Sequence, residues 1–445
     1  MLSKAAGLAL RLALPLLSAL IFFATGEAAL RAIYRGGGRL TLGAPGGGLF
    51  EHLTVHDQQR GRLEWGEKTA GVPRVMILGD SITWGTGIRQ WQDTWPEQLA
   101  RQLEAAGRPH QFAVLSLPGR EIDAHIAQFA SWAHEVQPDV LVYQWYVNDI
   151  EIVEHRPSTE RRWHRLPWHG SLLRTSYLYY FLDNRLQRLL RPPERSYVEY
   201  ILTDFIPGSV EWTEFERDFH GLATRAREVA PVRLLLLYPQ VPFTGPYPLQ
   251  SIHDRMKALA AARTISIPPI AWRREVGAIV ARPDARWKQA VRLPAHAGRT
   301  AVVTHAYYTR RALDLTVTFA AEALDPGAVV ATVSAIDPIT HATVVSAPLV
   351  AQSSRGLQTA RLHLGFPDNE GREVQVAVGA TAKDVEVASI DLEVDYGFHV
   401  LDLTDTMNTF DTHVSVFDAH PNAQAHKVVA QRVAAELTRL ESAGR

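Results

Sequence analysis

The sequence lacks cysteine altogether and shows no excess of charge of either sign. Without cysteine the chain has no disulfides and no thiol nucleophile, although this composition suits oxidising and reducing compartments alike. Lysine and arginine together number 46 and aspartate and glutamate 47, so the formal net charge is −1. This balance argues against nucleic-acid binding driven by net positive charge.

Familiar metal and phosphate motifs are also missing. The sequence has no His-Glu-x-x-His segment and no close histidine pair with a third ligand at a recognisable spacing. The glycine-rich stretch at residues 45–48 lacks the lysine and the preceding strand of a phosphate-binding loop. We therefore expect a reaction that uses neither a metal nor a cofactor.

The longest apolar stretch lies near the N-terminus and is short. It covers residues 12–26 and extends with interruptions from Leu8 to Ile33, whereas a spanning helix takes about 20 apolar residues. The helical pattern continues to Tyr34, which favours an uncleaved membrane anchor over residues 1–35. Small residues at 24–26 leave a cleaved signal peptide, and hence secretion, as the alternative. The glycine-rich residues 36–72 are predicted to be a linker.

The most informative segment that is present is Gly-Asp-Ser-Ile-Thr-Trp-Gly at residues 79–85. A short apolar run precedes it and predicts a buried strand, and helical spacing of apolar residues follows it from residue 93 to 107. Ser81 is therefore expected at a strand-to-helix turn, where an α/β sheet binds its ligands and a helix N-terminus favours negative charge. For the tripeptide taken alone, an ordinary turn is the favoured interpretation.

Three further segments follow predicted strands or precede the last helix. Gly119 comes after the run at 112–116, and Asn148 and Asp149 come after the run at 140–143. The sequence Asp-Ala-His-Pro-Asn at 418–422 precedes a helix with an apolar stripe, and Pro421 is expected as its first residue. With the heptad, these segments resemble the four blocks of the GDSL/SGNH hydrolases, a family of serine esterases and acyltransferases with a flavodoxin-like three-layer α/β fold.

The catalytic roles follow from that resemblance and from the chemistry of serine. A serine hydroxyl needs a base within hydrogen-bond reach, and a third group must orient that base. Ser81, His420 and Asp418 match these roles, with Asp411 and Asp405 as reserve carboxylates. Activity should then fall as His420 becomes protonated below about pH 6.5.

Donors to the oxyanion are expected from the same blocks. The candidates are the backbone N–H groups of Ser81 and Gly119 and the side-chain amide of Asn148. Three polar neighbours are predicted to have structural roles: Asp80, Asp149 and His426.

Two departures from the family pattern bear on mechanism. Tyr146 stands where the third block usually has glycine, and a single residue separates Asp418 from His420 where two are usual. The shorter spacing is similar to that of SGNH-like polysaccharide O-acetyltransferases. Together the departures motivate a non-catalytic alternative.

The predicted hydrolase domain is interrupted. The strand at 232–238 and the helix at 249–262 should be followed closely by a last strand, yet its candidate lies at 399–403. The residues between alternate apolar and polar side chains, with Asp-Pro-Gly and Pro-Asp-Asn turns. We therefore predict a hydrolase domain at 73–263 and 398–445, with a β-sandwich or jelly roll inserted at 264–397.

The inserted domain has two interpretations, a glycan-binding module or a structural insert. Its aromatic candidates for sugar binding are Trp287, Tyr307 and Tyr308. Aromatic residues between 149 and 232 could likewise line a sugar groove, but packing of helices over the sheet is the favoured prediction.

The sequence thus leads to a serine O-acyl esterase that removes acetyl groups from an extracytoplasmic polysaccharide through an acyl-serine intermediate. An O-acyltransferase with the same site and a membrane-tethered glycan-binding protein without catalysis are the alternatives. The expected partners are an acylated carbohydrate or other ester and, through the N-terminal helix, a membrane whose periplasmic or other extracytoplasmic side the catalytic domain faces.

Overall fold

The computed structural model describes most of the chain. The described residues are 15, 17–31, 66–150, 166–190, 197–407 and 412–443, apart from gaps at 89, 117, 120, 170, 173–175, 241–244, 270–271, 275–276, 297–301, 322–324, 354, 369, 382 and 416–417. Most of the predicted linker and the reserve carboxylate Asp411 lie outside the described residues.

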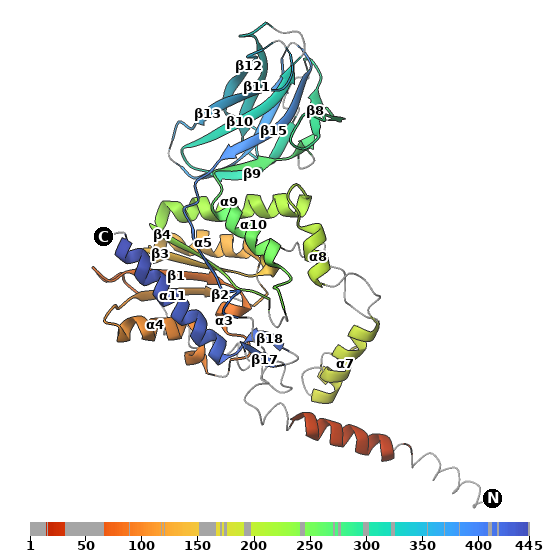
Figure 1. The fold of residues 1–445 in the computed structure, drawn as a ribbon, viewed down its shortest axis with the longest axis vertical. Helices are drawn as coiled ribbons and strands as arrows, with labels where there is room; N and C mark the ends of the chain where they lie inside the picture. Colours follow the sequence, from red (N-terminus) through yellow and green to blue (C-terminus); the bar gives the residue numbers. More distant parts are fainter. Residues whose placement is uncertain are drawn as a thin grey trace, which may run out of the picture.

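A five-stranded parallel sheet forms the centre of the hydrolase domain (Figure 1). Its strands are β1 (Arg74–Gly79), β2 (Gln111–Ser116), β3 (Val140–Trp145), β4 (Val232–Leu237) and β16 (His399–Asp402). The spatial order β16-β4-β3-β1-β2 is that of flavodoxin-like doubly wound sheets. Every residue of β1 and β3 is buried, as expected for strands that helices cover on both faces.

The register of the sheet brings the ends of three strands to one edge. Gly79 of β1 pairs with Ser116 of β2, and Leu78 pairs with Tyr143 of β3. The segments that follow these strands therefore begin side by side, and they are the segments that carry the first three sequence blocks.

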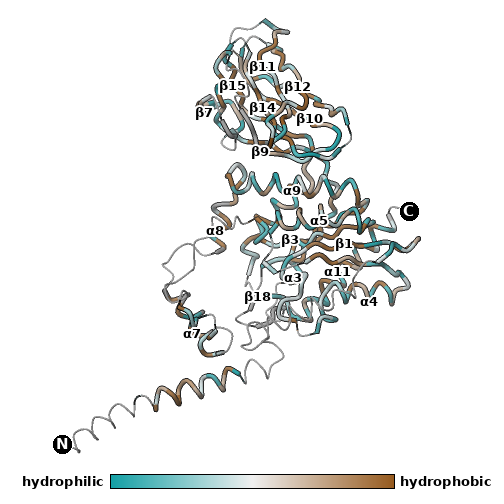
Figure 2. The backbone as a smooth tube through the Cα atoms, turned by 180° about the vertical axis from the view of Figure 1, so that it is seen from behind, coloured by the Kyte–Doolittle hydropathy of each residue, from teal (hydrophilic) through white to brown (hydrophobic). Residues whose placement is uncertain are grey.

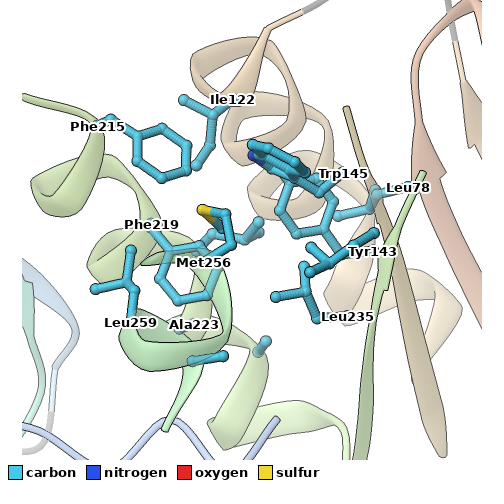
Figure 3. Packing of buried hydrophobic residues seen from close by; sticks show 14 of the residues in the cluster. Leu78, Ile122, Tyr143, Trp145, Phe215, Phe219, Ala223, Leu235, Met256 and Leu259 are labelled. Atoms are coloured by element: carbon cyan, nitrogen blue, oxygen red, sulfur yellow. The ribbon is translucent and has the colours of Figure 1, made fainter. Parts of the chain in front are cut away.

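Helices cover both faces of the sheet and complete a three-layer α/β domain (Figures 1 and 2). On one face, α4 (Trp95–Ala105) packs against α11 (Ala423–Ala443). The other face is covered by α5 (Ile122–Val136), α9 (Val210–Val229) and α10 (Gln250–Ala260). In Figure 3, Phe215 and Phe219 of α9 and Met256 of α10 lie over Tyr143 and Trp145 of β3. The predicted three-layer α/β fold is confirmed.

The sequence between α10 and β16 forms two antiparallel sheets. One has the order β13-β10-β15-β8-β7 with β5 beside β15, and the other has the order β12-β11-β14-β9-β6. The strands are β5 (Thr264–Ile267), β6 (Arg273–Arg274), β7 (Ala278–Ala281), β8 (Gln289–Leu293), β9 (Val302–Thr309), β10 (Ala312–Ala321), β11 (Val329–Ile336), β12 (Thr343–Val350), β13 (Gln358–Gly365), β14 (Arg372–Ala380) and β15 (Val385–Glu393).

The two sheets share one apolar core and so form a β-sandwich. Val317 and Phe319 of β10 pack in the same buried cluster as Val333 of β11 and Val376 of β14. Alternate residues of β10 face this core, because side chains of a strand point to opposite faces in turn. This alternation is the pattern from which the sequence predicted strands here.

The sandwich is fixed to the hydrolase domain through α9. The His220 Nε2 lies 3.0 Å from the backbone carbonyl of Tyr308, and its Nδ1 lies 3.3 Å from the Tyr396 hydroxyl. Burial lowers the pKa of His220 to about 4, so the ring is neutral at neutral pH. The Arg225 guanidinium lies 3.9 Å from the centre of the Tyr308 ring and 3.0 Å from a carboxylate oxygen of Glu373.

The three aromatic candidates for sugar binding pack in or beside this junction. Tyr307 is buried and its ring contacts His220, and Tyr308 is covered by Arg225. Trp287 is half-buried, with its Nε1 3.3 Å from the Ser266 hydroxyl. A side chain at Gly208 would meet the Trp287 ring at 2.7 Å. These aromatic rings pack between elements of the protein, which favours the structural interpretation of these residues.

Residues 17–31 form a helix whose apolar side chains are exposed, with Leu20 66% and Phe22 63% exposed. Its Glu27 accepts hydrogen bonds from the Ser176 hydroxyl at 2.9 Å and the Leu178 amide at 2.9 Å, at the start of α7 (Tyr177–Leu190). Within the part of the chain that the structure describes, no helix is both long enough and apolar enough to cross a membrane. The predicted anchor at 1–35 is described only in part, because residues 1–14, 16 and 32–35 lie outside the described residues.

Candidate active site

Ser81 lies at the sharp turn between the first strand and a short helix. It is the first residue of α3 (Ser81–Trp84), directly after β1 and Asp80. The Asp80 carboxylate accepts a hydrogen bond of 2.9 Å from the backbone N–H of Ile82, which caps this helix. Gly85 ends the helix with a φ of +83°, a conformation that glycine adopts without strain. The turn leaves Ser81 only partly buried at the carboxyl edge of the sheet.

The residue before this turn must be small. A Cβ at Gly79 would lie against the Thr83 hydroxyl and 2.7 Å from the side-chain oxygen Oε1 of Gln144. These two side chains are joined by a hydrogen bond of 2.8 Å, which connects α3 to β3. The absence of a side chain at Gly79 therefore lets the turn pack against the neighbouring strand.

His420 reaches Ser81 from the other end of the chain. Its Nε2 lies 2.9 Å from the Ser81 Oγ, although 339 positions separate the two residues. His420 belongs to β18 (Asp418–Pro421), which pairs with β17 (His413–Ser415). This is the hydrogen-bonded arrangement of a serine and its base.

The helix after His420 starts differently from the prediction. Pro421 is the last residue of β18, and α11 begins at Ala423. The Asn422 side chain accepts a hydrogen bond of 3.0 Å from the Ala425 amide, so asparagine supplies the cap. His426, predicted to be structural, is fully buried, and its Nδ1 accepts a hydrogen bond of 2.9 Å from the Trp95 amide.

The orienting carboxylate stays a prediction. The backbone of Asp418 pairs with Ser415 in the short hairpin, but its side chain lies outside the described part of the structure. Of the reserves, Asp411 lies outside the description as well, and Asp405 is exposed in the turn after β16.

The two predicted oxyanion donors beyond Ser81 lie on the segments that follow β2 and β3. Gly119 is exposed with a φ of +69°, and nothing lies within 4 Å of the position that a Cβ would take there. Asn148 is half-buried in η3 (Val147–Ile150), directly after β3. Because β2 and β3 flank β1, both segments begin beside the Ser81 turn.

Tyr146 fits the position where the resemblance of the third sequence block led us to expect glycine. It is not among the described residues with positive φ, so its backbone conformation does not require glycine. Its N–H donates to the Asp149 carboxylate at 3.1 Å, and its carbonyl accepts from the Asp149 amide at 2.9 Å. The ring leans edge-on against Tyr238, with ring centres 6.4 Å apart. The hydrogen bonds between Asp149 and the backbone of Tyr146 therefore hold the turn of the third block, and tyrosine does not disturb them.

A buried polar cluster of Asp149, Tyr143 and His125 holds the third block in position. Asp149 accepts a hydrogen bond of 2.9 Å from the Tyr143 hydroxyl, and His125 Nε2 lies 3.5 Å from its other oxygen. Burial disfavours the charged ring of His125, but Asp149 raises the pKa of this histidine above its ordinary value. Asp149 thus has the structural role predicted from the sequence, whereas His125 and Tyr143 were not predicted. The one available signal was the polar pair Tyr143 and Gln144 in an otherwise apolar strand.

Asp80 is also buried, and its environment disfavours its charge. Burial and the nearby carboxylate of Asp149 raise the pKa of Asp80 to about 6, against the hydrogen bond from Ile82. The second oxygen of Asp80 has no hydrogen-bond partner among the described residues. Asp80 therefore titrates near pH 6 beside the serine turn.

Among the residues that the structure describes, no group of three or more histidines and carboxylates is arranged to hold a metal ion.

Comparison with known proteins gives one family match. Residues 77–292 match the model of the GDSL-like lipase/acylhydrolase family. This segment starts in β1 and ends in the sandwich, so it includes Ser81, Gly119 and Asn148 but not His420. No curated protein sequence matches the chain.

Solved structures resemble each domain separately and weakly. The esterase EstA from Pseudoalteromonas sp. matches with 11% identity over 42% of this chain and 71% of its own, at a TM-score of 0.25. The acetylxylan esterase Axe2 from Geobacillus stearothermophilus matches with 11% identity over 43% and 72%, at a TM-score of 0.25. A carbohydrate-binding module of the Cellvibrio mixtus lichenase 5A matches with 7% identity over 29% and 97%, at a TM-score of 0.22.

These structural scores are too low to carry an argument, so the assignment rests on the family match. That match coincides with the serine turn and with the two segments predicted to donate to an oxyanion. Residues 77–292, which carry the serine turn, are similar to the GDSL-like lipase/acylhydrolase family, also called SGNH hydrolases, and the protein is an esterase.

Proposed function

We propose that the protein cleaves esters through an acyl-serine intermediate formed on Ser81. The observation that carries this proposal is the 2.9 Å contact between the Ser81 Oγ and the His420 Nε2. His420 takes the serine proton as the Oγ attacks the ester carbonyl, and the carbonyl oxygen becomes an oxyanion. The N–H groups of Ser81 and Gly119 and the amide of Asn148 donate to that oxyanion, and Asp418 orients His420.

His420 then acts as the acid that completes acylation, and afterwards as the base and acid of the hydrolysis step. His420 returns the proton to the leaving alcohol as the carbon–oxygen bond breaks, which leaves the acyl group on Ser81. His420 then takes a proton from water, the water attacks the acyl-serine, and the acid leaves as the proton returns to Ser81. If a sugar hydroxyl replaces water, the same intermediate yields an O-acyltransferase, which is the second candidate function.

We propose an acetylated extracytoplasmic polysaccharide as the substrate. What supports a polymeric substrate is the arrangement of the chain, in which a β-sandwich is inserted between the serine and its base and is attached to α9 by His220 and Arg225. Tyr146 supports catalysis over a non-catalytic binding role. Its backbone hydrogen bonds to Asp149 hold the turn that carries Asn148, although glycine is absent from this position.

One experiment separates these candidates. Purified protein and its Ser81→Ala variant are given a chromogenic acetyl ester, with and without an oligosaccharide acceptor. We expect hydrolysis that falls by at least about 10³-fold in the variant. Acetylated oligosaccharide in place of free acetate would favour transfer. Equal behaviour of both proteins with several acyl donors would contradict the proposed role of Ser81.

We further propose that the N-terminal helix attaches the protein to a membrane, with the catalytic domain on the extracytoplasmic side. Support comes from the exposed apolar side chains of residues 17–31 and from α7, where Leu182, Leu186 and Leu189 are 40%, 43% and 79% exposed. Glu27 joins the end of the first helix to the start of α7, the helix that carries these exposed leucines.

Flotation with lipid vesicles tests the attachment. The full chain should float, and the variant Phe22→Glu/Phe23→Glu should remain at the bottom of the gradient. The alternative of a cleaved signal peptide predicts a mature N-terminus beyond residue 24, which N-terminal sequencing of protein from a secreting host would detect.

A further inference from the structure

The β-sandwich contains a cavity of about 870 Å³ that the esterase mechanism does not use. Four cationic side chains and two carboxylates line it: Arg282, Arg292, Arg355, Lys383, Asp384 and Glu386. The other lining residues that the structure describes are alanines and a glycine, and none of the described lining residues is aromatic. These described residues together carry a net charge of +2, in a chain whose overall net charge is −1.

The cavity lies at the end of the sandwich that points away from the hydrolase domain. Strand β10 starts at Ala312, beside α9, and ends at Ala321, which lines the cavity. Nine residue steps along a strand span roughly 30 Å. Strand β15 runs the opposite way, from the cavity at its start to the hydrolase domain after its end (Figure 1).

Part of the positive charge is held in place by Glu386. Its carboxylate lies 3.3 Å from Arg282 Nη1 and 3.0 Å from Arg292 Nε. Arg282 also pairs with Asp284 at 3.0 Å, and Asp384 accepts a hydrogen bond of 2.8 Å from the Ala295 amide. These contacts hold the Arg282 and Arg292 guanidinium groups at the wall of the cavity, so Arg355 and Lys383 account for the net positive charge of the described lining.

We propose that this cavity binds a carboxylate-bearing segment of a polysaccharide, such as a run of uronic acid residues. A volume of this size accommodates a short oligosaccharide. Recognition is by charge, because the aromatic residues that would stack on neutral sugar rings pack at the other end of the domain. The inference rests on the proposed function because it assumes a polymeric substrate. It adds that this polymer carries carboxylate groups.

The position of the cavity explains why the ligand must be a chain. A ligand held about one strand length beyond α9 is not the ester that reaches Ser81. A polymer can occupy both places, so the sandwich raises the local concentration of acyl groups near the esterase site.

Binding is tested with the full-length Ser81→Ala variant, so that ester chemistry does not interfere. Polygalacturonate is the acidic probe, dextran the neutral probe, and inorganic polyphosphate the probe of charge alone. We expect binding of polygalacturonate that weakens at least tenfold between about 50 and 500 mM salt, because ions screen exposed charges. Dextran should not bind, and polyphosphate should bind more weakly than polygalacturonate.

The added variant Arg355→Glu/Lys383→Glu reverses two charges of the lining and should weaken polygalacturonate binding by at least tenfold. Arg361→Glu is the matched control, since the Arg361 side chain is 86% exposed on β13 and does not line the cavity. An unchanged thermal midpoint shows that each variant is folded, and Arg355→Ala/Lys383→Ala serves as the milder variant if the reversal unfolds the domain.

Three results would overturn the inference: binding that both cavity variants leave intact, equal binding of dextran, or equal or tighter binding of polyphosphate. Hydrolysis of the chromogenic ester by the wild type is measured separately. Loss of that activity with intact polygalacturonate binding contradicts only the proposed function, and intact activity without binding contradicts only the acidic ligand.

Discussion

Single residues around Ser81 decide whether the serine turn forms. Gly79 leaves room for the hydrogen bond between Thr83 and Gln144, and Asp80 caps the helix that Ser81 begins. None of these residues reacts in the proposed mechanism. Their effect on catalysis is exerted through the position of the Ser81 Oγ relative to His420.

Gly79→Ala should lower activity much more than the loss of one hydrogen bond would. The new methyl group would lie 2.7 Å from the Gln144 oxygen and against the Thr83 hydroxyl, so the turn must shift. We expect kcat/KM for a chromogenic ester to fall by at least about 10²-fold, since misplacement by about 1 Å has effects of that size. The double variant Gly79→Ala/Thr83→Ala removes the contact with the Thr83 hydroxyl but keeps two contacts of 2.7 Å, so it should recover only part of the activity. A single variant with wild-type kcat/KM would contradict this account of the turn.

Asp80 should make the protein less stable as the pH rises. Its pKa is about 6 in the folded state against an ordinary value of 3.8, so the folded state holds the proton more tightly. The stabilisation is complete below about pH 4 and is lost as the pH rises through 6. Asp80→Asn removes this dependence while its side-chain oxygen still accepts from Ile82.

The difference in free energy of unfolding between Asp80→Asn and wild type is the quantity to measure. It should shift in favour of the variant by up to about 3 kcal/mol between pH 4 and pH 7.5, because one pKa unit corresponds to about 1.4 kcal/mol. Urea titrations at the two pH values give it directly. A difference that stays constant with pH would contradict the raised pKa.

At the scale of elements, the third block depends on a buried group contributed by α5 and β3. Asp149 in η3 holds the Tyr143 hydroxyl and the Tyr146 amide, with His125 of α5 alongside. The segment that carries Asn148 is therefore fixed from two sides. Its geometry is set by side chains that do not touch the substrate.

Asp149→Ala should release this segment and leave the Tyr143 hydroxyl without its acceptor. An unsatisfied buried polar group costs about 1–3 kcal/mol, so the free energy of unfolding should fall by about that amount. Activity should fall mainly in kcat, because Asn148 is proposed to act on the oxyanion. The matched control Tyr143→Phe removes one hydrogen bond without displacing Asn148, and it should keep most of the activity. A larger kinetic defect in Tyr143→Phe than in Asp149→Ala would contradict this assignment.

The sequence predicted the elements that have a clear apolar pattern, and it failed where contacts between distant residues set the local structure. Continuous apolar runs predicted β1, β3 and β4, and the change from a strand pattern to a helix pattern around Ser81 predicted the turn. The start of α11 was wrong, because β18 is only four residues long and shows no pattern of its own. His125 escaped notice because its importance lies in its distance to Asp149, which no local pattern encodes.

At the scale of the whole molecule, the junction on α9 joins two separate cores. His220 is buried there in its neutral form, with hydrogen-bond partners on both nitrogens. Arg225 adds a cation–π contact to Tyr308 and an ion pair with Glu373. The orientation of the sandwich relative to the hydrolase domain thus depends on these polar contacts together with aromatic packing, such as that of Phe219 of α9 against Tyr396.

Acid should weaken this junction through His220. Its pKa of about 4 in the folded state lies below the ordinary value of 6.5, so its stabilisation is complete above about pH 6.5 and is lost as the pH falls toward 4. His220→Leu should be less stable than wild type at pH 7.5, since the Tyr308 carbonyl loses its donor, but it should lose less stability between pH 7.5 and 4.5. Calorimetry at both pH values measures this, and an equally steep loss in both proteins would contradict it.

The long separation between Ser81 and His420 also affects how the enzyme comes into being. A ribosome that makes the chain from its N-terminus completes the serine turn first, then the whole sandwich, and only afterwards β16 and the hairpin that holds His420. Strand β16 must then join the exposed edge of β4 before the base can meet the serine. A partly synthesised chain therefore carries no assembled serine–histidine pair, and the proposed mechanism requires it to be inactive toward esters until its last segment has docked.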